Sequence, residues 1–434
     1  MNPAVIFILI TVMIDAMGIG LIVPVMPDLI REVNGGTIAT AALWGGILST
    51  TFAVMQFLFG PVVGGLSDRF GRRPVLLISL VVMALDYVVM AVAGSIWLLL
   101  LGRIVGGITA ATQSTANAYM ADISKPHEKA ANFGLVGAAF GAGFVFGPLM
   151  GGFLGELGTR APFYAAAALA ALNAVFGYFV LKETVTDRIR RPFEWRRANP
   201  LGALKVLGKL PGIAALLWVY FLYQFAFAVY PSVWAYFGNV QFGWTPSTIG
   251  LSLLLFGGTM AIVQAGLIRP VLRVLGERGT VIYGHGFDIF AFAAIAFVSS
   301  GTVALILTPI AAFAAVITPA LQGIMSKAVR DDQQGELQGA LTSVSALAMI
   351  ASPMVMSSVF FAFAEPSRPM SFPGAPFLLS AGLMVVALLV FLRHGHTREV
   401  AGAAKNGGPA PQTKSSIGGP APQTPRNISG QKKG

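Results

Sequence analysis

The stretch GGLSDRFGRRP, residues 64–74, lies between two apolar runs near residues 43–64 and 75–95. Each run is long enough to cross a lipid bilayer, which takes about 20 helical residues. Asp68 is placed to pair with Arg72 or to cap a helix N-terminus. The glycines at its start would let a neighbouring helix approach closely. The stretch therefore predicts a charged latch between two membrane helices, with a plain basic loop that sets topology as the alternative. The predicted gating loop comprises Gly64, Ser67, Asp68, Arg69, Gly71, Arg72 and Arg73, together with Asp122.

The composition indicates a membrane protein with many spans. The chain has 434 residues, of which 55% are hydrophobic and 11% are charged, and its mean hydropathy is +0.74. An ordinary soluble domain carries about 25% charged residues. The absence of Cys excludes disulfides, thiolate metal sites and thiol catalysis. The net charge of +11 is concentrated in residues 182–209 and in the C-terminal tail, so nucleic-acid binding is disfavoured.

The apolar runs predict an all-α membrane protein of about twelve transmembrane helices, six on each side of a basic linker. The expected divisions are an N-terminal half over residues 1–181, a cytoplasmic linker over 182–211, a C-terminal half over 212–395 and a disordered cytoplasmic tail over 396–434, which carries GGPAPQT twice. The predicted spans lie near 4–27, 43–64, 75–95, 97–118, 131–154, 161–181, 212–236, 247–268, 279–299, 301–324, 338–362 and 374–392.

The basic residues predict the orientation. With the N-terminus in the cytoplasm, 25 of the 29 Lys and Arg residues fall in inside segments. The first apolar run has no basic flank or small-residue cleavage site, so it is expected to be a first span and not a cleaved signal. The loops 120–134 and 325–339 each run from Met to Gly over equal lengths, which indicates two repeated halves.

Four ionisable residues lie inside predicted spans: Asp15, Asp86, Arg103 and Asp288. Each charge at a helix centre costs about 2.5–3.5 kcal/mol on insertion scales, so such residues usually mark a path for protons, ions or a charged substrate. The alternative for any one acid is a static pair with Arg103, but one arginine does not neutralise three carboxylates. Asp288 stands alone in the C-terminal half and is therefore the first choice for the proton site.

Other polar residues are weaker candidates. His285 lies one turn from Asp288 and is predicted either to relay protons or only to pack. Aromatic residues at 218–236 are expected to form part of the cavity wall and part of an interfacial belt. Amides within the helices should line a cavity or join helices by hydrogen bonds: Gln56, Gln113, Asn117, Gln224 and Gln264.

The fifth predicted span is rich in glycine. Small residues at three-to-four spacing let helices touch, and a Gly-Pro pair permits a kink. We expect this helix to seal the membrane while the halves rock, with generic helix packing as the alternative. The residues concerned are Gly141, Gly147, Pro148, Gly151 and Gly152.

Together these residues resemble the tetracycline/proton antiporters of the major facilitator superfamily, over nearly the whole chain up to about residue 395. The segments that carry the resemblance are DAMGIGLIVPVMPDLIRE (15–32), LSDRFGRRPVLLISL (66–80), LDYVVMA (85–91), GRIVGGIT (102–109), GPLMGGFLGE (147–156), FGW (242–244), PALQGIMS (319–326) and QQGELQG (333–339).

The resemblance implies the major facilitator fold and export of a divalent-metal–tetracycline complex from a bacterial cytoplasm, across the cytoplasmic (inner) membrane, driven by proton entry. The expected partners are the drug, protons and the lipid bilayer. A divalent cation such as Mg²⁺ would belong to the cargo, and no permanent cofactor or protein-held metal is expected. By position, Asp15, Asp86 and Asp288 match the family's intramembrane acids, and Arg103 its helix-four arginine. Ser67, Asp68 and Arg72 match its gating loop, and Gln56 and Gln264 its glutamines.

Three departures bear on the substrate. The family's helix-eight histidine corresponds to Met260, its small-residue run corresponds to Ala110–Thr115, and its helix-seven Gly-Gln-x-Pro pattern corresponds to Phe227–Pro231. A proton-coupled transporter of another small molecule is therefore the main alternative. An intramembrane aspartyl protease is a further alternative, but it leaves the repeated halves unexplained and no partner motif appears. A non-transporting sensor is the last alternative.

Overall fold

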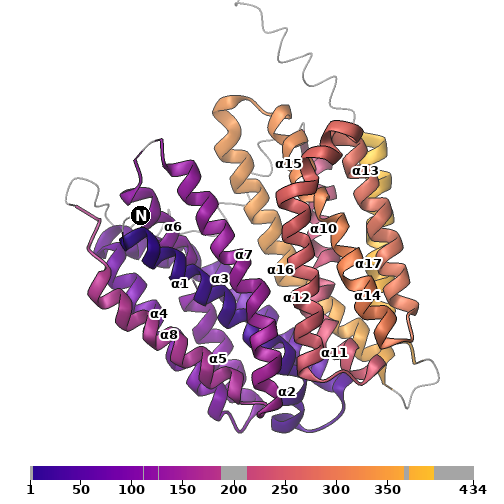
Figure 1. Cartoon of the computed structure of the whole chain (residues 1–434), viewed down its shortest axis with the longest axis horizontal. Helices are drawn as coiled ribbons and strands as arrows, with labels where there is room; N and C mark the ends of the chain where they lie inside the picture. The colour runs from indigo at the N-terminus through magenta and orange to yellow at the C-terminus, as the bar shows by residue number, and fades with distance from the viewer. Residues whose placement is uncertain (1–2, 111, 126, 187–212, 366–370, 395–434) are drawn as a thin grey trace, which may run out of the picture. The chain divides into compact units, whose positions relative to one another are not determined.

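Apolar runs broken by Gly and Pro determine where the helices begin, bend and end. The computed structural model describes residues 3–110, 112–125, 127–186, 213–365 and 371–394, and Figure 1 shows that they form helices joined by short connections. No strand occurs among these residues. The predicted linker 182–211 falls largely, and the tail 396–434 entirely, outside them.

The described residues of the N-terminal half form nine helical elements: α1 (Pro3–Ile22), η1 (Val23–Val25), α2 (Met26–Asn34), α3 (Ile38–Phe70), α4 (Arg72–Val92), α5 (Ile96–Thr109), α6 (Thr112–Ile123), α7 (Lys129–Glu156) and α8 (Ala161–Val180).

The described part of the C-terminal half comprises α10 (Ala214–Phe227), α11 (Val229–Phe242), α12 (Pro246–Ile262), the π-helical segment η4 (Val263–Leu267), α13 (Ile268–Phe297), α14 (Gly301–Ala311), η5 (Ala312–Val316), α15 (Ile317–Ala328), η6 (Asp331–Gln333), α16 (Gln334–Ala364) and α17 (Ala375–His394).

Eleven helical stretches among the described residues, counted across short interruptions, are long and apolar enough to cross a membrane. One of them, Pro246–Phe297, has 52 residues. At 1.5 Å per residue it would be about 78 Å long, more than twice the roughly 30 Å of a hydrocarbon core. It turns at Gly276, where φ is +66°, a value that L-residues other than glycine rarely adopt. This stretch therefore provides two crossings, which agrees with the predicted total of about twelve.

Two predicted spans are interrupted where the sequence predicted continuous helices. The fourth span breaks between α5 and α6 at Ala110. The seventh breaks between α10 and α11 at Ala228. Pro231 follows this break and cannot donate a backbone hydrogen bond to the carbonyl of Phe227, four residues earlier. Both breaks fall in the segments where the chain departs from the family pattern.

The predicted gating loop is a tight helix-to-helix junction and not an extended loop. Helix α3 continues to Phe70 and α4 begins at Arg72. Gly71, with φ +113°, is the single residue between them, and a Cβ there would also come within 2.6 Å of the Glu183 carboxyl carbon. The expectation that Gly64 admits a close helix is wrong for this conformation, because nothing lies within 4 Å of a Cβ built there.

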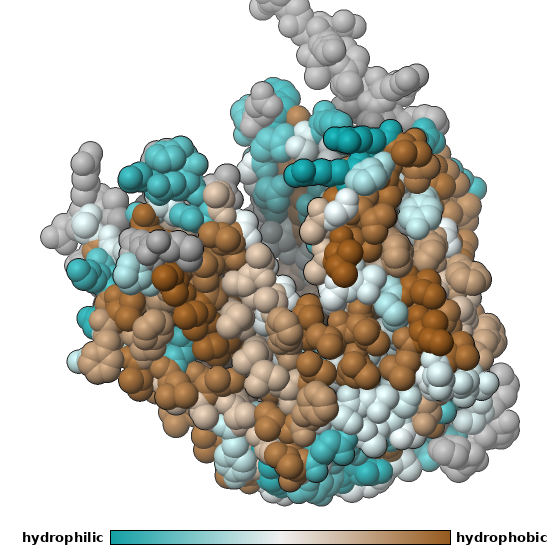
Figure 2. Space-filling view, in the orientation of Figure 1, coloured by the Kyte–Doolittle hydropathy of each residue, from teal (hydrophilic) through white to brown (hydrophobic). Residues whose placement is uncertain are grey.

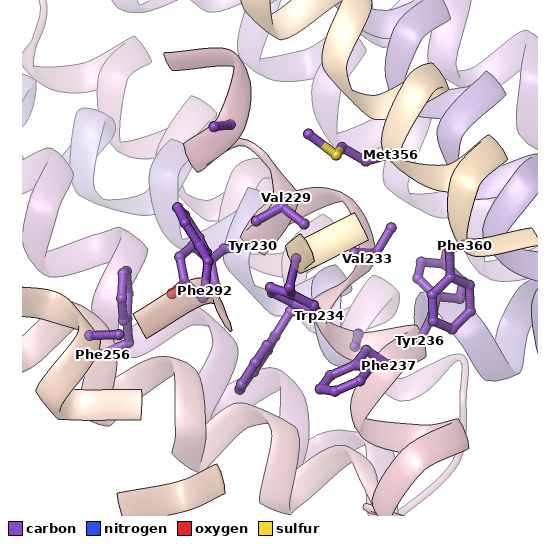
Figure 3. Packing of buried hydrophobic residues seen from close by; sticks show 14 of the residues in the cluster. Val229, Tyr230, Val233, Trp234, Tyr236, Phe237, Phe256, Phe292, Met356 and Phe360 are labelled. Atoms are coloured by element: carbon purple, nitrogen blue, oxygen red, sulfur yellow. The ribbon is translucent and has the colours of Figure 1, made fainter. Parts of the chain in front are cut away.

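The expected aromatic wall on the seventh span is largely a packed core. Tyr230 and Trp234 on α11 lie among rings that include Phe256 and Phe292, as Figure 3 shows. Trp218 is 62% exposed and Tyr236 faces the cavity described below. Most of the aromatic residues in this span therefore hold the C-terminal half together.

Glycines on α7 bring the two halves into contact. A Cβ at Gly147 would come within 2.6 Å of the Met17 carbonyl oxygen on α1, and one at Gly152 within 2.5 Å of the Pro246 carbonyl oxygen at the start of α12. Gly151 packs on the Leu21 backbone, whereas Gly141 has no neighbour within 4 Å. Helix α7 therefore touches α1 in its own half and α12 in the other.

The halves close at one end only. Their contacts run along α3 with α16 and along α7 with α12. Hydrogen bonds between the halves include Thr37 to Glu365 and Ser247 to Glu156, at the end where α3 and α12 begin. Figure 2 shows the surface hollowed between the halves toward the opposite end, at which α6 and α15 lie in Figure 1.

We expect Gly151→Ala to destabilise the fold, because the new Cβ would lie within 2.6 Å of the Leu21 carbonyl carbon and the helices would have to separate. Overpacking of this kind costs about 1–3 kcal/mol. The apparent melting temperature of the purified protein in detergent should fall. Gly141→Ala on the same helix is the matched control and should not lower it, and an equal fall in both variants would refute the packing argument.

Candidate functional site

A cavity of about 480 Å³ lies where the two halves meet. Its ionisable residues are Asp15, Asp86 and Arg103, with Gln56 and Tyr87 beside them. The C-terminal half contributes few polar groups. The residues that line the cavity are Val12, Asp15, Ile19, Ile22, Val23, Met26, Gly45, Leu48, Ser49, Phe52, Ala53, Gln56, Met83, Asp86, Tyr87, Arg103, Gly106, Thr109, Ala110, Phe140, Phe144, Pro231, Ser232, Ala235, Tyr236, Met349 and Pro353.

Asp86 and Arg103 form a buried ion pair. Arg103 Nη2 donates to Asp86 Oδ2 at 3.0 Å, and the two side chains are 11% and 3% exposed, respectively. Two glycines of α5 make room for the carboxylate, since a Cβ at Gly102 would come within 2.7 Å of Asp86 Oδ1 and one at Gly106 within 2.6 Å of Oδ2. The Arg103 guanidinium also lies 5.2 Å from the Phe52 ring centroid, a cation–π contact.

Asp15 forms no such ion pair within the part of the chain that the structure describes. Its Oδ1 is buried without a hydrogen bond among the described residues, and so are Asp86 Oδ1 and Arg103 Nε. Buried polar atoms are normally paired, so three unpaired ones at one cavity point to a ligand, water or a proton as the missing partner. With all three residues ionised, the cavity would carry one net negative charge, which favours a cationic guest.

The five amide residues that were predicted to line a cavity or join helices lie in different environments. Gln56 lines the cavity and donates to the Ala110 carbonyl at 3.5 Å, at the break in the fourth span. Gln224 donates to Ser345 Oγ at 3.2 Å and so joins α10 to α16. Gln264 lies exposed in η4, and Asn117 is half-buried on α6. The side chain of Gln113 lies outside the part that the structure describes.

Asp288 lies in a separate environment. It is 2% exposed on α13 and is not among the residues that line the cavity. Its electrostatic neighbours include Tyr223 and Tyr230. Nδ1 of His285 is 2.9 Å from the Val281 carbonyl oxygen. Asp288 Oδ2, His285 Nε2 and the Tyr230 hydroxyl are buried without hydrogen-bond partners among the described residues.

The charged residues of the predicted gating loop form a polar cluster at the open end. Arg72 donates to Ser67 Oγ at 2.6 Å and to Asp122 Oδ2 at 3.3 Å, and it also pairs with Asp68. Arg73 donates to the Tyr178 carbonyl at 2.9 Å. Arg69 lies exposed over the Phe70 ring. These contacts join α3, α4, α6 and the end of α8 within one half.

The sequence did not predict the central role of Glu183 in this cluster. Its carboxylate accepts the backbone N–H groups of Arg72 at 2.9 Å and Arg73 at 3.2 Å, and so caps the N-terminus of α4. Thr184 donates to Asp122 Oδ2 at 3.0 Å. Glu183 is 111 residues from Arg72 in sequence. The available signal was an acid at the end of the sixth span, beside a helix N-terminus rich in arginine.

Comparison with known proteins agrees with this architecture. Residues 8–353 match the family model of the Major Facilitator Superfamily. The class C tetracycline resistance protein of Escherichia coli is 40% identical, with 92% of this chain and 98% of that protein covered. The class G protein of Vibrio anguillarum is 39% identical, with 84% and 92% covered.

More distant relatives share the fold. Multidrug resistance protein 2 of Bacillus subtilis (strain 168) is 28% identical, with 88% of this chain and 94% of that protein covered. The crystal structure of the human organic anion transporter MFSD10 (TETRAN) superposes with a TM-score of 0.66 at 26% identity, covering 89% of this chain and 98% of that one.

A bundle of membrane helices in two halves around a charged central cavity defines a secondary transporter and not an enzyme. The match to the family model and the identity to the resistance proteins then narrow the class. The chain belongs to the Major Facilitator Superfamily and, within it, to the tetracycline resistance proteins. It is a multi-pass membrane protein and a drug exporter.

We expect Arg103→Met alone to cost about 3–5 kcal/mol, because it leaves the Asp86 carboxylate buried without its charge partner. The double variant Asp86→Leu with Arg103→Met should recover most of that loss, since both charges are removed together. Thermal or denaturant unfolding of the two single variants and the double variant gives the coupling energy. Additive losses would show that the pair does not interact in the protein.

Proposed function

We propose that this protein is a proton-coupled exporter that exchanges a divalent-metal–tetracycline complex for an incoming proton. The observation that carries the proposal is the cavity between the halves, which holds Asp15, Asp86 and Arg103 with unpaired buried polar atoms. The names of the resistance-protein relatives suggest the drug class. The divalent cation, such as Mg²⁺, would enter and leave as part of the cargo.

The net charge of the ionisable residues in the cavity supports a cationic cargo. Arg103 neutralises Asp86 across a 3.0 Å ion pair, so Asp15 would be left to attract a positive complex. Apolar and aromatic groups such as Phe52, Phe140 and Tyr236 also line the cavity. A planar drug with a bound metal would find both an apolar wall and a counter-charge there.

Alternating access is the transport mechanism that fits this arrangement. The halves meet at the end that carries Thr37 and Glu156 and separate toward the end that carries Arg72. In the orientation predicted from the basic residues, the open end faces the cytoplasm of a bacterial cell and both termini are cytoplasmic. Rocking of the halves about the midplane would then carry the cavity outward.

The proton site is proposed to be Asp288. This residue lies outside the cavity lining, so protonation of Asp288 would not remove the counter-charge that holds the drug. Asp15 would then be the carboxylate for which the drug and the proton compete directly. Asp288 would act through the packing of the C-terminal half, with His285 and Tyr230 as neighbours that also hold unpaired polar atoms.

A different small molecule is the second candidate. Ala110 and Pro231 line the cavity and lie in the segments that depart from the family pattern. These departures change the wall that would contact the drug and leave the acids in place. A thermal-shift screen of tetracyclines and other cationic drugs on the purified protein separates the two candidates.

Expression in a bacterium without its own drug pumps should raise tetracycline tolerance, and Asp288→Asn should abolish that gain, because a buried carboxyl that no longer titrates cannot carry the coupled proton. Asp332→Asn is the matched control, because this acid is exposed and paired with Arg330 outside the helical core. Unchanged tolerance with the well-expressed protein would reject tetracycline as the substrate.

The separate locations of the acids predict a split between binding and coupling. Asp15→Asn should weaken drug binding, measured by drug fluorescence, because it removes the unpaired charge in the cavity. Asp288→Asn should retain drug binding but abolish drug-driven proton movement in vesicles, measured with a pH-sensitive dye. Normal coupling in both variants and in Asp86→Asn would contradict the mechanism.

A further inference from the structure

At the closed end, a carboxylate from the N-terminal half caps a helix of the C-terminal half. Glu156 is the last residue of α7. It accepts the backbone N–H of Ser247 at 3.2 Å and also interacts with the Thr245 and Ser247 side chains. Helix α12 begins at Pro246. The side chain of its N-cap residue, Thr245, accepts no hydrogen bond from the backbone N–H groups of the first turn. The carboxylate therefore supplies the cap that α12 lacks.

A second carboxylate makes the reverse contact. Glu365 directly follows α16, and its Oε2 accepts a hydrogen bond from Thr37 Oγ1 at 2.8 Å. Thr37 is the N-cap of α3, and its Oγ1 accepts the N–H of Thr40 at 3.3 Å. The acid of the C-terminal half therefore lies at the N-terminus of a helix in the N-terminal half.

The two contacts are related by the repeat of the halves. Helices α7 and α16 are the fifth crossings of their halves, and α3 and α12 contain the second crossings. In each case an acid at the end of a fifth crossing meets the start of the second crossing of the other half. Helix N-termini carry a partial positive charge, so a carboxylate is favourable there.

We propose that Glu156 and Glu365 are positioning residues of the transport cycle, which hold the outer ends of the two halves together and release them once per cycle. Each contact joins residues of different halves, so each exists only while the outer end is closed. Gly45 and Gly46 lie in the same interface, where they meet Tyr236 and Ser357, and add close packing to the polar contacts. The inference rests on the alternating-access part of the proposed function and is independent of the substrate.

The test uses the natural absence of Cys in the chain. Ala42→Cys places a reporter at a buried position on α3, one turn from Gly45 and Gly46, and Ala53→Cys places one in the cavity on the same helix. A membrane-impermeant maleimide then labels Ala42→Cys from outside only when the outer end opens. No drug is added.

Glu156→Gln and Glu365→Gln should each raise the outside labelling rate of Ala42→Cys about two- to fivefold, the range for one carboxylate at a helix N-terminus. The effects should multiply in the double variant. Labelling of Ala53→Cys from the cytoplasmic side should fall in the same variants, because the two openings exclude each other. Glu156→Asp and Glu365→Asp keep the charge and should restore part of the closure.

Glu32→Gln is the matched control. This acid lies near the same end, but its partners Arg160 and Thr159 belong to its own half. It should leave both labelling rates unchanged. Unaltered labelling of Ala42→Cys in the double variant, or an equal change in Glu32→Gln, would overturn the proposal. A failure of the protein to export tetracycline would overturn the substrate assignment and leave the labelling result intact.

Discussion

The ion pair between Asp86 and Arg103 is the interaction around which the cavity is organised. Two opposite charges inside an apolar bundle require close contact and good geometry, and the 3.0 Å bond between them meets this requirement. Gly102 and Gly106 leave the space that the carboxylate fills, and Phe52 covers the guanidinium. The pair accounts for one acid only. Asp15 therefore has no counter-charge among the described residues that line the cavity. Asp288 lies buried in the other half, outside that lining.

The glycines of α7 provide the second constraint. Because Gly147 and Gly151 admit α1 and Gly152 admits α12, a single helix joins the wall of its own half to the other half. Backbones this close tolerate no added side-chain atom, so the closed end of the protein is held by closely fitted helices and not by a loose apolar contact. Glu156 at the end of α7 and Glu365 after α16 lie at the same end, and each meets the N-terminus of a helix in the other half. Packing and capping thus act at the same end.

The sequence predicted the helices and the family because long apolar runs, basic connections and glycine spacing are local features. It also predicted the pairing of Asp68 with Arg72, which are four residues apart. It did not predict that Glu183 caps α4, that Gly64 faces open space, or that Ala110 and Ala228 interrupt their spans. These features depend on contacts between distant segments or on the particular conformation. The separation of Asp288 from the cavity is another such feature. The sequence shows that four ionisable residues lie in apolar helices, but it does not show which of them share a site.

That separation constrains how a proton could drive export. A ligand shifts a conformational equilibrium only by its different affinity for the two conformations. Asp288 is buried among Tyr223, Tyr230 and His285, away from the cavity lining, so its protonation acts on the drug only if the packing around it differs between the inward-open and outward-open forms. Tyr230 contacts Trp234 and Phe377, and Pro231 and Ser232, the next two residues on α11, line the cavity. Helix α11 therefore links the surroundings of the isolated acid to the cavity, because Tyr230 and the two residues after it lie on the same helix.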